Sequence, residues 1–508
     1  MKYWLGIDIG TGGSRALLVE AQGNIAAGVT VAHEDIQMTQ PLWAEQRPQN
    51  WWDATVEAIQ GALEKVGANG SDIAGVGLSG QMHGLVLLDA DNQVVRPALI
   101  WCDQRCEEQV DWINSIAGKD MILQQTANPV LTGFTAPKLI WVRDHDPASY
   151  EKTRKVLLPK DYVRFCLTGQ FASDVSDASG TALFDVVNRR WAKKLIEKLD
   201  IDYSLLPPVV ESSEVVGAVT AEASVKTGLK EGTPVVAGAG DQAAGAVGAG
   251  IVESGLVSCT IGTSGVVFSH LDRVDYDPQG RVHTFCHAVP GKWHVMGVTQ
   301  AAGLSLQWFR NRLGVDAVTT PKEEDVDPYT LLIKEGMRSP EGSEGLFWLP
   351  YLMGERTPHL DAQARGAWVG LTAKHTREHL VRSVIEGVSY SLKDCLAIVE
   401  SLGVDVKVVR ASGGGARSLS WLKVLANVFD RPIATLSTQE GSAFGAALLG
   451  MVGSGHHVSV SEACRVSISE EQRVVPDIES SREYQKRYEV FNSLYPALRQ
   501  AYRDISEL

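Results

Sequence analysis

The sequence predicts an α/β protein built from two domains, and three observations lead to this fold class. At 508 residues the chain is too long for one ordinary hydrophobic core. Strand-like runs alternate along it with amphipathic helical patterns. A Gly-Thr turn between two strand-like runs occurs once near the start and once near the middle. We therefore expect two sheets covered by helices, each opened by one of these turns.

The repeated turn sets the expected domain boundaries. IGTGG (residues 9–13) is echoed by IGTSG (residues 261–265), and each copy reads as the tip of a β-hairpin. With a hinge near residues 245–257, we expect an N-terminal domain over 1–247 and a C-terminal domain over 256–453. Residues 454–508 then form an extension that ends in a helix.

Two helices can be predicted with their ends. Pro48 suits a first helical turn, Gly67 suits a helix end, and the residues between them place four apolar side chains on one face: Trp52, Val56, Ile59 and Leu63. Thr376 suits an N-cap, and the helix after it carries an apolar stripe of Leu380, Val384, Val388, Leu392 and Leu396.

Composition narrows the function classes. Hydrophobic residues make up 44% and charged residues 21%, as in soluble globular proteins, and the net charge of -14 argues against nucleic-acid or anionic-membrane partners. We expect no membrane span, since the chain has no apolar run of the required length. Seven cysteines without a spaced framework indicate reduced thiols and a cytoplasmic protein. In HTFCH (residues 283–287), packing or substrate-side roles are favoured over metal binding.

Both Gly-Thr turns can cradle phosphate. They offer backbone N–H groups and hydroxyls without bulky side chains, and Thr11, Gly12 and Thr263 are the candidate residues. For one copy alone an ordinary tight turn is the simpler interpretation. Two matched copies favour a nucleotide that bridges a cleft between the domains.

Other nucleotide motifs fail. The chain has no Walker A pattern, and the glycines of residues 75–80 lie inside a strand-like run rather than before a helix. Residues 238–243 are preceded by a strand and followed by a helix, but Asp241 would stand where a pyrophosphate belongs. An anion facing an anion excludes a dinucleotide-binding dehydrogenase.

Asp241 follows a strand and begins a helix of small residues. It can be a helix cap, a catalytic carboxylate at the mouth of the sheet, or both. Asp8 ends the first strand beside the first phosphate turn, where a carboxylate can hold Mg²⁺ or its water ligands. Arg15 lies just beyond that turn and can neutralise phosphate charge.

A third glycine cluster, SGGGAR (residues 412–417), leads into a helix from Ser418. The bare backbone at Gly414 and Gly415 suits an adenine or ribose lying across it. The alternative is a helix-entry turn, and the cluster alone does not decide between the two.

Taken together, these motifs resemble the FGGY family of carbohydrate kinases. The resemblance rests on DIGTGGSR, GDQAAG, TIGTSG, SGGGAR, the segment GFTAPKLIWV (residues 133–142), and GAWVGL (residues 366–371) followed by His379-Leu380 and SVIE (residues 383–386). It covers residues 3 to 453. It implies two actin-like (ribonuclease H-like) domains with a nucleotide and sugar cleft between them, ATP and Mg²⁺ as cofactors, and Asp241 as the catalytic base.

Within the family, the segments PLWAEQ (residues 41–46), GQMHG (residues 80–84), LLPKDYVRFCLTG (residues 157–169) and HTFCHAVP (residues 283–290) resemble members that phosphorylate D-xylulose. This implies that Met82 and His83 contact the sugar, as do Asp241 and Gln242. Gln242 stands where some relatives have Asn, which leaves its contact less defined. Alternatively, His83 only satisfies a backbone carbonyl.

The expected function is therefore ATP-dependent conversion of D-xylulose to D-xylulose 5-phosphate, by a protein that can form a homodimer. Another ketopentose or a polyol is the alternative substrate within the family. A non-catalytic actin-like sugar sensor is a third interpretation, which the intact Asp8, Asp241 and both Gly-Thr turns disfavour.

Overall fold

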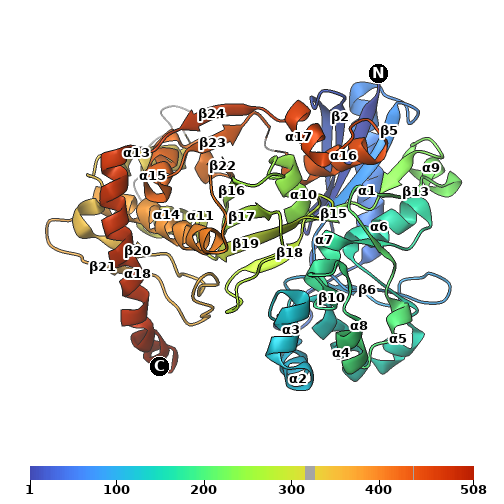
Figure 1. Cartoon of the computed structure of the whole chain (residues 1–508), viewed down its shortest axis with the longest axis horizontal. Coiled ribbons are helices and arrows are strands. Elements are labelled where there is room, and N and C mark those ends of the chain that lie inside the picture. Colours follow the sequence, from blue (N-terminus) through green and yellow to red (C-terminus); the bar gives the residue numbers. More distant parts are fainter. Residues whose placement is uncertain (315–326, 439) are drawn as a thin grey trace.

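The computed structural model describes residues 1–314, 327–438 and 440–508, which form two lobes around two separate sheets (Figure 1). The predicted α/β class with two sheet-centred domains is confirmed. No helix within the described ranges is long and apolar enough to cross a membrane. All seven cysteines are free, in agreement with the expected reduced thiols.

The first sheet has seven strands. Its order is β13 (Val215–Ala218), β14 (Pro234–Val236), β5 (Ile73–Gly80), β1 (Tyr3–Ile9), β2 (Gly13–Glu20) and β3 (Ile25–Ala32), with β15 (Ala239–Gly240) also paired to β5. β1, β2 and β3 form an antiparallel meander, whereas β5 runs parallel to β1 and β14 runs parallel to β5. The glycines of residues 75–80 lie inside a strand, as predicted.

The second sheet repeats this plan. Its order is β18 (His283–Cys286), β19 (Trp293–Thr299), β17 (Gly265–Leu271), β16 (Leu256–Ile261), β22 (Val408–Ser412), β23 (Ile433–Leu436) and β24 (Glu470–Val474). The meander β16–β17–β19 matches β1–β2–β3, and β22 is parallel to β16 as β5 is to β1. Both predicted hairpins are therefore present, and their Gly-Thr turns lie at equivalent places on the two sheets.

The two helices predicted with their ends are confirmed. α1 (Pro48–Val66) ends at Gly67, which adopts the left-handed conformation that glycine favours, and its buried side includes Trp52, Ile59 and Leu63. α14 (Arg377–Ser401) begins with a capping box between Thr376 and His379. It runs through the hydrophobic core of the second lobe.

The remaining elements extend the lobes. The first lobe contains α2 (Glu107–Ala117), α3 (Lys119–Thr126), α4 (Thr135–His145), α5 (Pro147–Lys152), α6 (Pro159–Thr168), α7 (Val175–Ala178), α8 (Lys193–Lys198), α9 (Ala221–Thr227), α10 (Asp241–Gly248) and the strand pairs β4–β7 (Glu45–Gln46, Ala98–Leu99), β6–β8 (Val86–Leu88, Lys155–Leu157), β9–β12 (Ser173–Asp174, Val209–Val210) and β10–β11 (Phe184–Asp185, Arg190–Trp191). The later half contains α11 (Gly303–Leu313), α13 (Pro328–Gly336), β20 (Phe347–Leu349), β21 (Ala367–Val369), α15 (Leu419–Phe429), α16 (Gly441–Gly453), α17 (Val460–Ser467) and α18 (Ile478–Ser506).

α16 belongs to the later half of the chain but packs on the first sheet, against β1 and β5 (Figure 1). The contact is backbone to backbone. A Cβ atom added at Gly6 would lie 1.9 Å from the carbonyl oxygen of Ala443, and one at Gly77 would lie 1.8 Å from that of Ala446. α16 also packs along α10, so these two helices connect the lobes.

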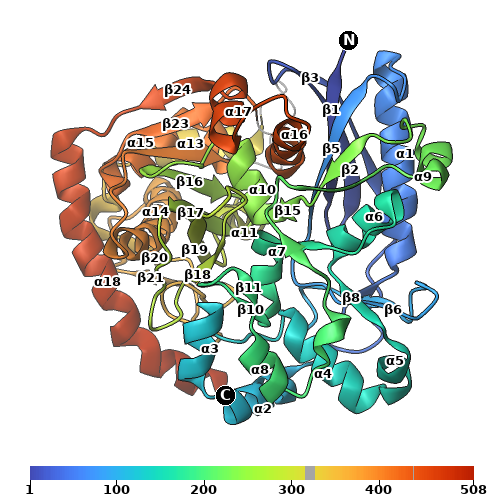
Figure 2. The same ribbon diagram turned by 45° about the vertical axis from the view of Figure 1, so that its right-hand side comes forward.

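The last residues are integrated into the second lobe. β24 pairs with β23 at the edge of the second sheet, and α18 packs against α15. Figure 2 shows α18 along the outer edge of this lobe, far from the first sheet.

Candidate active site

The candidate site is a cavity between α10, the start of α16, the second Gly-Thr turn and the third glycine cluster. The cavity, of about 530 Å³, is lined by Asp241 and Gln242 from α10, by Gly262 and Ser264 from the second turn, and by Gly413 and Gly414 from the third glycine cluster. Groups that are distant in the sequence therefore share one enclosure. The cavity has room for the phosphates of a nucleotide, beside Asp241.

Asp241 is the first residue of α10, after the strand β15. Burial and the negative charge of Asp8 raise its pKa to about 7, and groups of Gln242 partly offset this effect. A carboxylate with a pKa near neutrality can accept a proton from a hydroxyl group as a general base. Its backbone carbonyl also accepts a hydrogen bond of 3.0 Å from Ser442 Oγ, at the start of α16.

Asp8 lies at the end of β1, directly before the first turn. Burial raises its pKa, and the neighbouring Ser79 hydroxyl and, to a smaller extent, the Arg15 charge oppose this rise. No hydrogen bond of normal geometry reaches its buried Oδ1 atom from the described residues. A buried carboxylate oxygen without a partner is a suitable ligand for Mg²⁺ or for one of its waters. Asp8 therefore fits the predicted metal role, in a site that would be completed by phosphate oxygens.

The first turn is held by the surrounding side chains. The indole of Trp101 donates to Thr11 Oγ1 at 2.9 Å, and Gln46 Nε2 donates to the Thr11 carbonyl at 2.8 Å. Gly12 is exposed at the tip, and a Cβ there would touch nothing within 4 Å. Thr11 and Gly12 remain predicted phosphate contacts.

Arg15 lies beside this turn in an ion pair. Its guanidinium contacts Glu440 Oε2 at 2.6 Å and donates to Thr30 Oγ1 at 2.8 Å. The ion pair joins β2 to the residue that precedes α16. A phosphate contact by Arg15 stays a prediction, and it would require the guanidinium to be shared with Glu440.

A second cavity, of about 750 Å³, adjoins the first. Thr263, Gly414 and Gly415 line it together with Gln307 from α11 and Lys334 from α13. Its size and its mixed polar and apolar walls suit a nucleoside. Gly414 and Gly415 were predicted from the sequence to lie along the adenosine, whereas the residues that α11 and α13 contribute to the cavity wall were not predicted.

Two of the residues predicted to bind sugar, Met82 and His83, follow β5 and lie close to the strand end that precedes Asp241. Met82 packs against the strand end that leads to Asp241, since a Cβ added at Gly240 would lie 2.9 Å from Met82 Cγ. His83 adopts a positive φ of 68° in the turn after β5. The ring of His83 stacks on Phe134 with centroids 4.6 Å apart.

The protonation state of His83 follows from its contacts. Burial lowers its pKa to about 3, an effect reinforced by the charges of Lys138 and Arg356, so the ring is neutral. Nδ1 lies 2.6 Å from the carbonyl oxygen of Gly180 and must therefore carry the proton. Nε2 is then an acceptor, suited to a hydroxyl group. The ring thus does satisfy a backbone carbonyl, but through one nitrogen only.

Three contributors to this region were not assigned a role from the sequence. Phe134 supports the His83 ring, Lys138 donates to the His83 carbonyl oxygen at 3.0 Å, and Arg356 reaches the region from the second lobe. Phe134 and Lys138 belong to the motif at residues 133–142, which could have indicated them. For Arg356 no local signal exists.

HTFCH contributes to the same region. His283 stacks on Phe285 with centroids 5.7 Å apart and lies 3.2 Å from Asn128 Oδ1, while burial lowers its pKa well below the usual value. These contacts agree with the packing or substrate-side roles expected for the segment.

Comparison with known proteins relates this geometry to characterised families. The model for the N-terminal domain of the FGGY family of carbohydrate kinases matches residues 3–248, and that for the C-terminal domain matches residues 257–454. The chain is 38% identical to a xylulose kinase of Bacillus subtilis over 97% of both chains.

Solved structures of sugar kinases share the fold of this chain. A xylulose kinase from Rhodospirillum rubrum is 30% identical, with a TM-score of 0.91 over 99% of this chain and 100% of that one. A gluconate kinase from Lactobacillus acidophilus is 26% identical, with a TM-score of 0.91 over 99% of both chains. The predicted actin-like fold is thereby confirmed.

Proposed function

The chain belongs to the FGGY family of carbohydrate kinases, and from this premise we propose that it transfers the γ-phosphoryl group of ATP to D-xylulose, giving D-xylulose 5-phosphate. Similarity to xylulose kinases over nearly the whole chain supports this substrate. The observation that carries the proposal is the position of Asp241, a carboxylate of near-neutral pKa that lines the phosphate-sized cavity and directly follows Gly240, against which Met82 packs.

In the proposed reaction the Asp241 carboxylate accepts the proton of the C5 hydroxyl group. The oxygen of that hydroxyl forms a bond to the γ-phosphorus while the bond from phosphorus to the leaving ADP oxygen breaks. Asp241 needs no strong basicity, because the proton leaves as the new bond forms. Its pKa near 7 leaves a large fraction of the carboxylate ionised at neutral pH.

The other candidate residues position the reactants. Neutral His83 accepts a hydrogen bond from a sugar hydroxyl through Nε2, Met82 supplies an apolar wall, and Gln242 offers an amide. On the nucleotide side, Thr11, Gly12 and Thr263 hold phosphates, and Gly414 and Gly415 lie along the adenosine.

Asp8 would hold Mg²⁺ through its Oδ1 atom, directly or through water. The ion supplies charge neutralisation for the β- and γ-phosphates when it is bound. We place the reaction in the cytoplasm, where ATP is available, and a homodimer stays a prediction.

A substrate panel with purified protein tests the proposal. ADP release is measured with Mg-ATP and D-xylulose, D-ribulose, D-gluconate or glycerol, and the product is examined by ³¹P NMR. We expect the highest kcat/KM with D-xylulose and a phosphate on O5. D-Gluconate is included because a gluconate kinase has the same fold. A higher kcat/KM for D-gluconate than for D-xylulose would contradict the proposed substrate but would still support a sugar kinase.

A further inference from the structure

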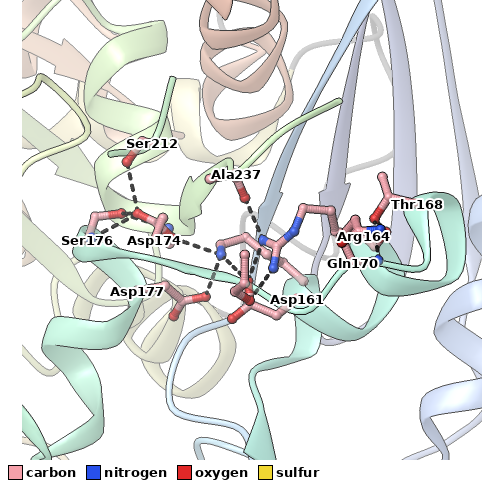
Figure 3. Close-up of polar contacts among 12 residues, drawn as sticks. Asp161, Arg164, Thr168, Gln170, Asp174, Ser176, Asp177, Ser212 and Ala237 are labelled. Atoms are coloured by element: carbon pink, nitrogen blue, oxygen red, sulfur yellow. Dashed lines mark hydrogen bonds and ion pairs between the residues drawn. The ribbon is translucent and has the colours of Figure 1, made fainter. Parts of the chain in front are cut away.

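A buried cluster of charges lies close enough to the proposed base for the charge of Asp241 to affect Asp177. Figure 3 shows the polar contacts of this cluster. Lys160 Nζ contacts three carboxylates: Asp161 at 2.6 Å, Asp174 at 2.8 Å and Asp177 at 3.4 Å. Arg164 pairs with Asp161 at 2.7 Å, and all five side chains are fully buried. Burial and the neighbouring carboxylates raise the pKa of Asp177 well above its usual value.

Stability alone is a poor reason for such a cluster. Removing charges from water costs several kcal/mol per ion, and well-packed apolar side chains are often as stable as a buried ion pair. Specific orientation of a neighbouring segment is a better-founded role, so the contacts that leave the cluster are informative.

Those contacts hold the strand end that delivers Asp241. Arg164 Nη1 donates to the carbonyl oxygen of Ala237 at 2.8 Å. The N–H of Gly240, the residue before Asp241, donates to Ser176 Oγ at 3.1 Å, and Ser176 Oγ donates to Asp174 Oδ2 at 2.5 Å. The residue directly before the proposed base is therefore linked, through the Ser176 hydroxyl, to a carboxylate that pairs with Lys160.

The same segment also orients His83. Asp174 caps α7, and α7 is followed directly by a 3₁₀ turn (Ser179–Thr181). The carbonyl oxygen of Gly180, in the middle of this turn, accepts a hydrogen bond from His83 Nδ1. One short stretch thus sets the strand end before the base and the tautomer of the sugar-binding ring.

We propose that Ser176 is a positioning residue for phosphoryl transfer, because its hydroxyl links the peptide before Asp241 to the buried cluster around Lys160. The inference rests on the proposed function, since it requires Asp241 to act as the base. Ser176 is fully buried, so its proposed effect passes through Gly240 rather than through contact with a substrate. It acts by keeping the carboxylate within reach of the sugar hydroxyl.

Ser212 provides a matched control (Figure 3). Its hydroxyl is also fully buried and donates to the same Asp174 Oδ2 atom, at 2.8 Å, but it has no bond to Gly240. Ser176→Ala and Ser212→Ala therefore each remove one hydroxyl hydrogen bond to Asp174 Oδ2, and only Ser176→Ala also leaves the Gly240 N–H without its partner.

The test compares both variants with wild type by kinetics and thermal unfolding. We expect Ser176→Ala to lower kcat with D-xylulose by about 10- to 100-fold, the cost of a small misplacement of a catalytic group. KM for ATP should stay unchanged, and Ser212→Ala should retain the wild-type kcat. In an Asp241→Asn background, Ser176→Ala should cause no further loss, because the group that it positions is already absent.

Equal kcat values for the two serine variants would overturn the inference, as would a full additional loss in the Asp241→Asn background. If Ser176→Ala does not fold, Ser176→Cys keeps the volume and weakens only the hydrogen bonds, and the same two outcomes apply to it. A wild-type protein without sugar kinase activity would instead refute the proposed function, so the two failures are distinguishable.

Discussion

Asp241 and His83 show how burial can adapt ordinary side chains to opposite tasks. Burial and the charge of Asp8 raise the pKa of Asp241 to about 7, whereas burial lowers the pKa of His83 to about 3. The first shift prepares a carboxyl group for proton transfer. The second keeps an imidazole neutral, with Nε2 available as an acceptor. Both shifts favour the uncharged form in a region of low polarity.

The raised pKa of Asp241 predicts a cost in stability at high pH. The folded-state pKa lies above the ordinary value of 3.8, so the associated stability is fully present below that value and is lost as the pH rises through about 7. Asp241→Asn removes this titration. Without ligands, we expect the variant to melt at a higher temperature than wild type at about pH 8.5, with a much smaller difference at about pH 5. A difference independent of pH would contradict the assigned pKa.

His83→Ala should impair sugar recognition specifically. Loss of the Nε2 acceptor and of the stacked ring should lower kcat/KM for D-xylulose by about 10- to 100-fold, corresponding to roughly 1.5–3 kcal/mol for a buried hydrogen bond. Sugar-independent ATP hydrolysis serves as the internal control and should change far less. Unaltered kinetics with D-xylulose would mean that His83 serves only the Gly180 carbonyl.

At the scale of elements, the contact between α10 and α16 depends on glycine. A Cβ added at Gly445 would lie 1.8 Å from the carbonyl oxygen of Ala244, a backbone atom that cannot move away independently. A Cβ at Gly245, on the facing helix, would meet only Ser442 Oγ at 3.4 Å. The two positions thus offer the same substitution in one helix pair with different steric outcomes.

We therefore expect Gly445→Ala to destabilise the protein by about 1–3 kcal/mol or more, the usual cost of overpacking. Gly245→Ala should leave stability unchanged or raise it slightly, because alanine favours helix over glycine. Chemical denaturation of the two variants decides this prediction. Equal midpoints would show that the helices can separate without cost.

The elements that sequence alone could predict are those with local signals. Pro48 and Gly67 marked the ends of α1, Thr376 marked the start of α14, and the repeated Gly-Thr turns marked both hairpins. The packing of α16 on the first sheet could not be predicted in this way. It depends on shape complementarity between segments far apart in the chain, which leaves no periodic pattern.

In the candidate site, too, residues in local motifs could be predicted, whereas contacts between distant segments could not. Asp8, Asp241 and the glycine turns occur in recognisable motifs, and the cavities do bring Asp241, Thr263 and Gly414 into adjoining spaces. The stacking of Phe134 on His83, the approach of Arg356 and the bond from Gly240 to Ser176 arise only when distant segments meet.

For the whole molecule, the two lobes should approach each other when both substrates bind. The phosphate turns containing Thr11 and Thr263 lie on different sheets, so a triphosphate held by both draws the lobes together. Small-angle scattering should give a smaller radius of gyration with D-xylulose and a non-hydrolysable ATP analogue than with either alone. An unchanged radius would indicate a rigid cleft.

The central claim is that the carboxylate of Asp241 is the base for phosphoryl transfer between the lobes. Its most direct test is the single-turnover rate of Asp241→Asn at saturating Mg-ATP and D-xylulose, with sugar binding followed by tryptophan fluorescence. We predict nearly unchanged sugar affinity and a rate about 10²- to 10⁴-fold below wild type, the usual contribution of a positioned general base. A variant that binds sugar normally and keeps a third or more of the wild-type rate would contradict the claim and leave Asp241 as a helix-terminal residue only.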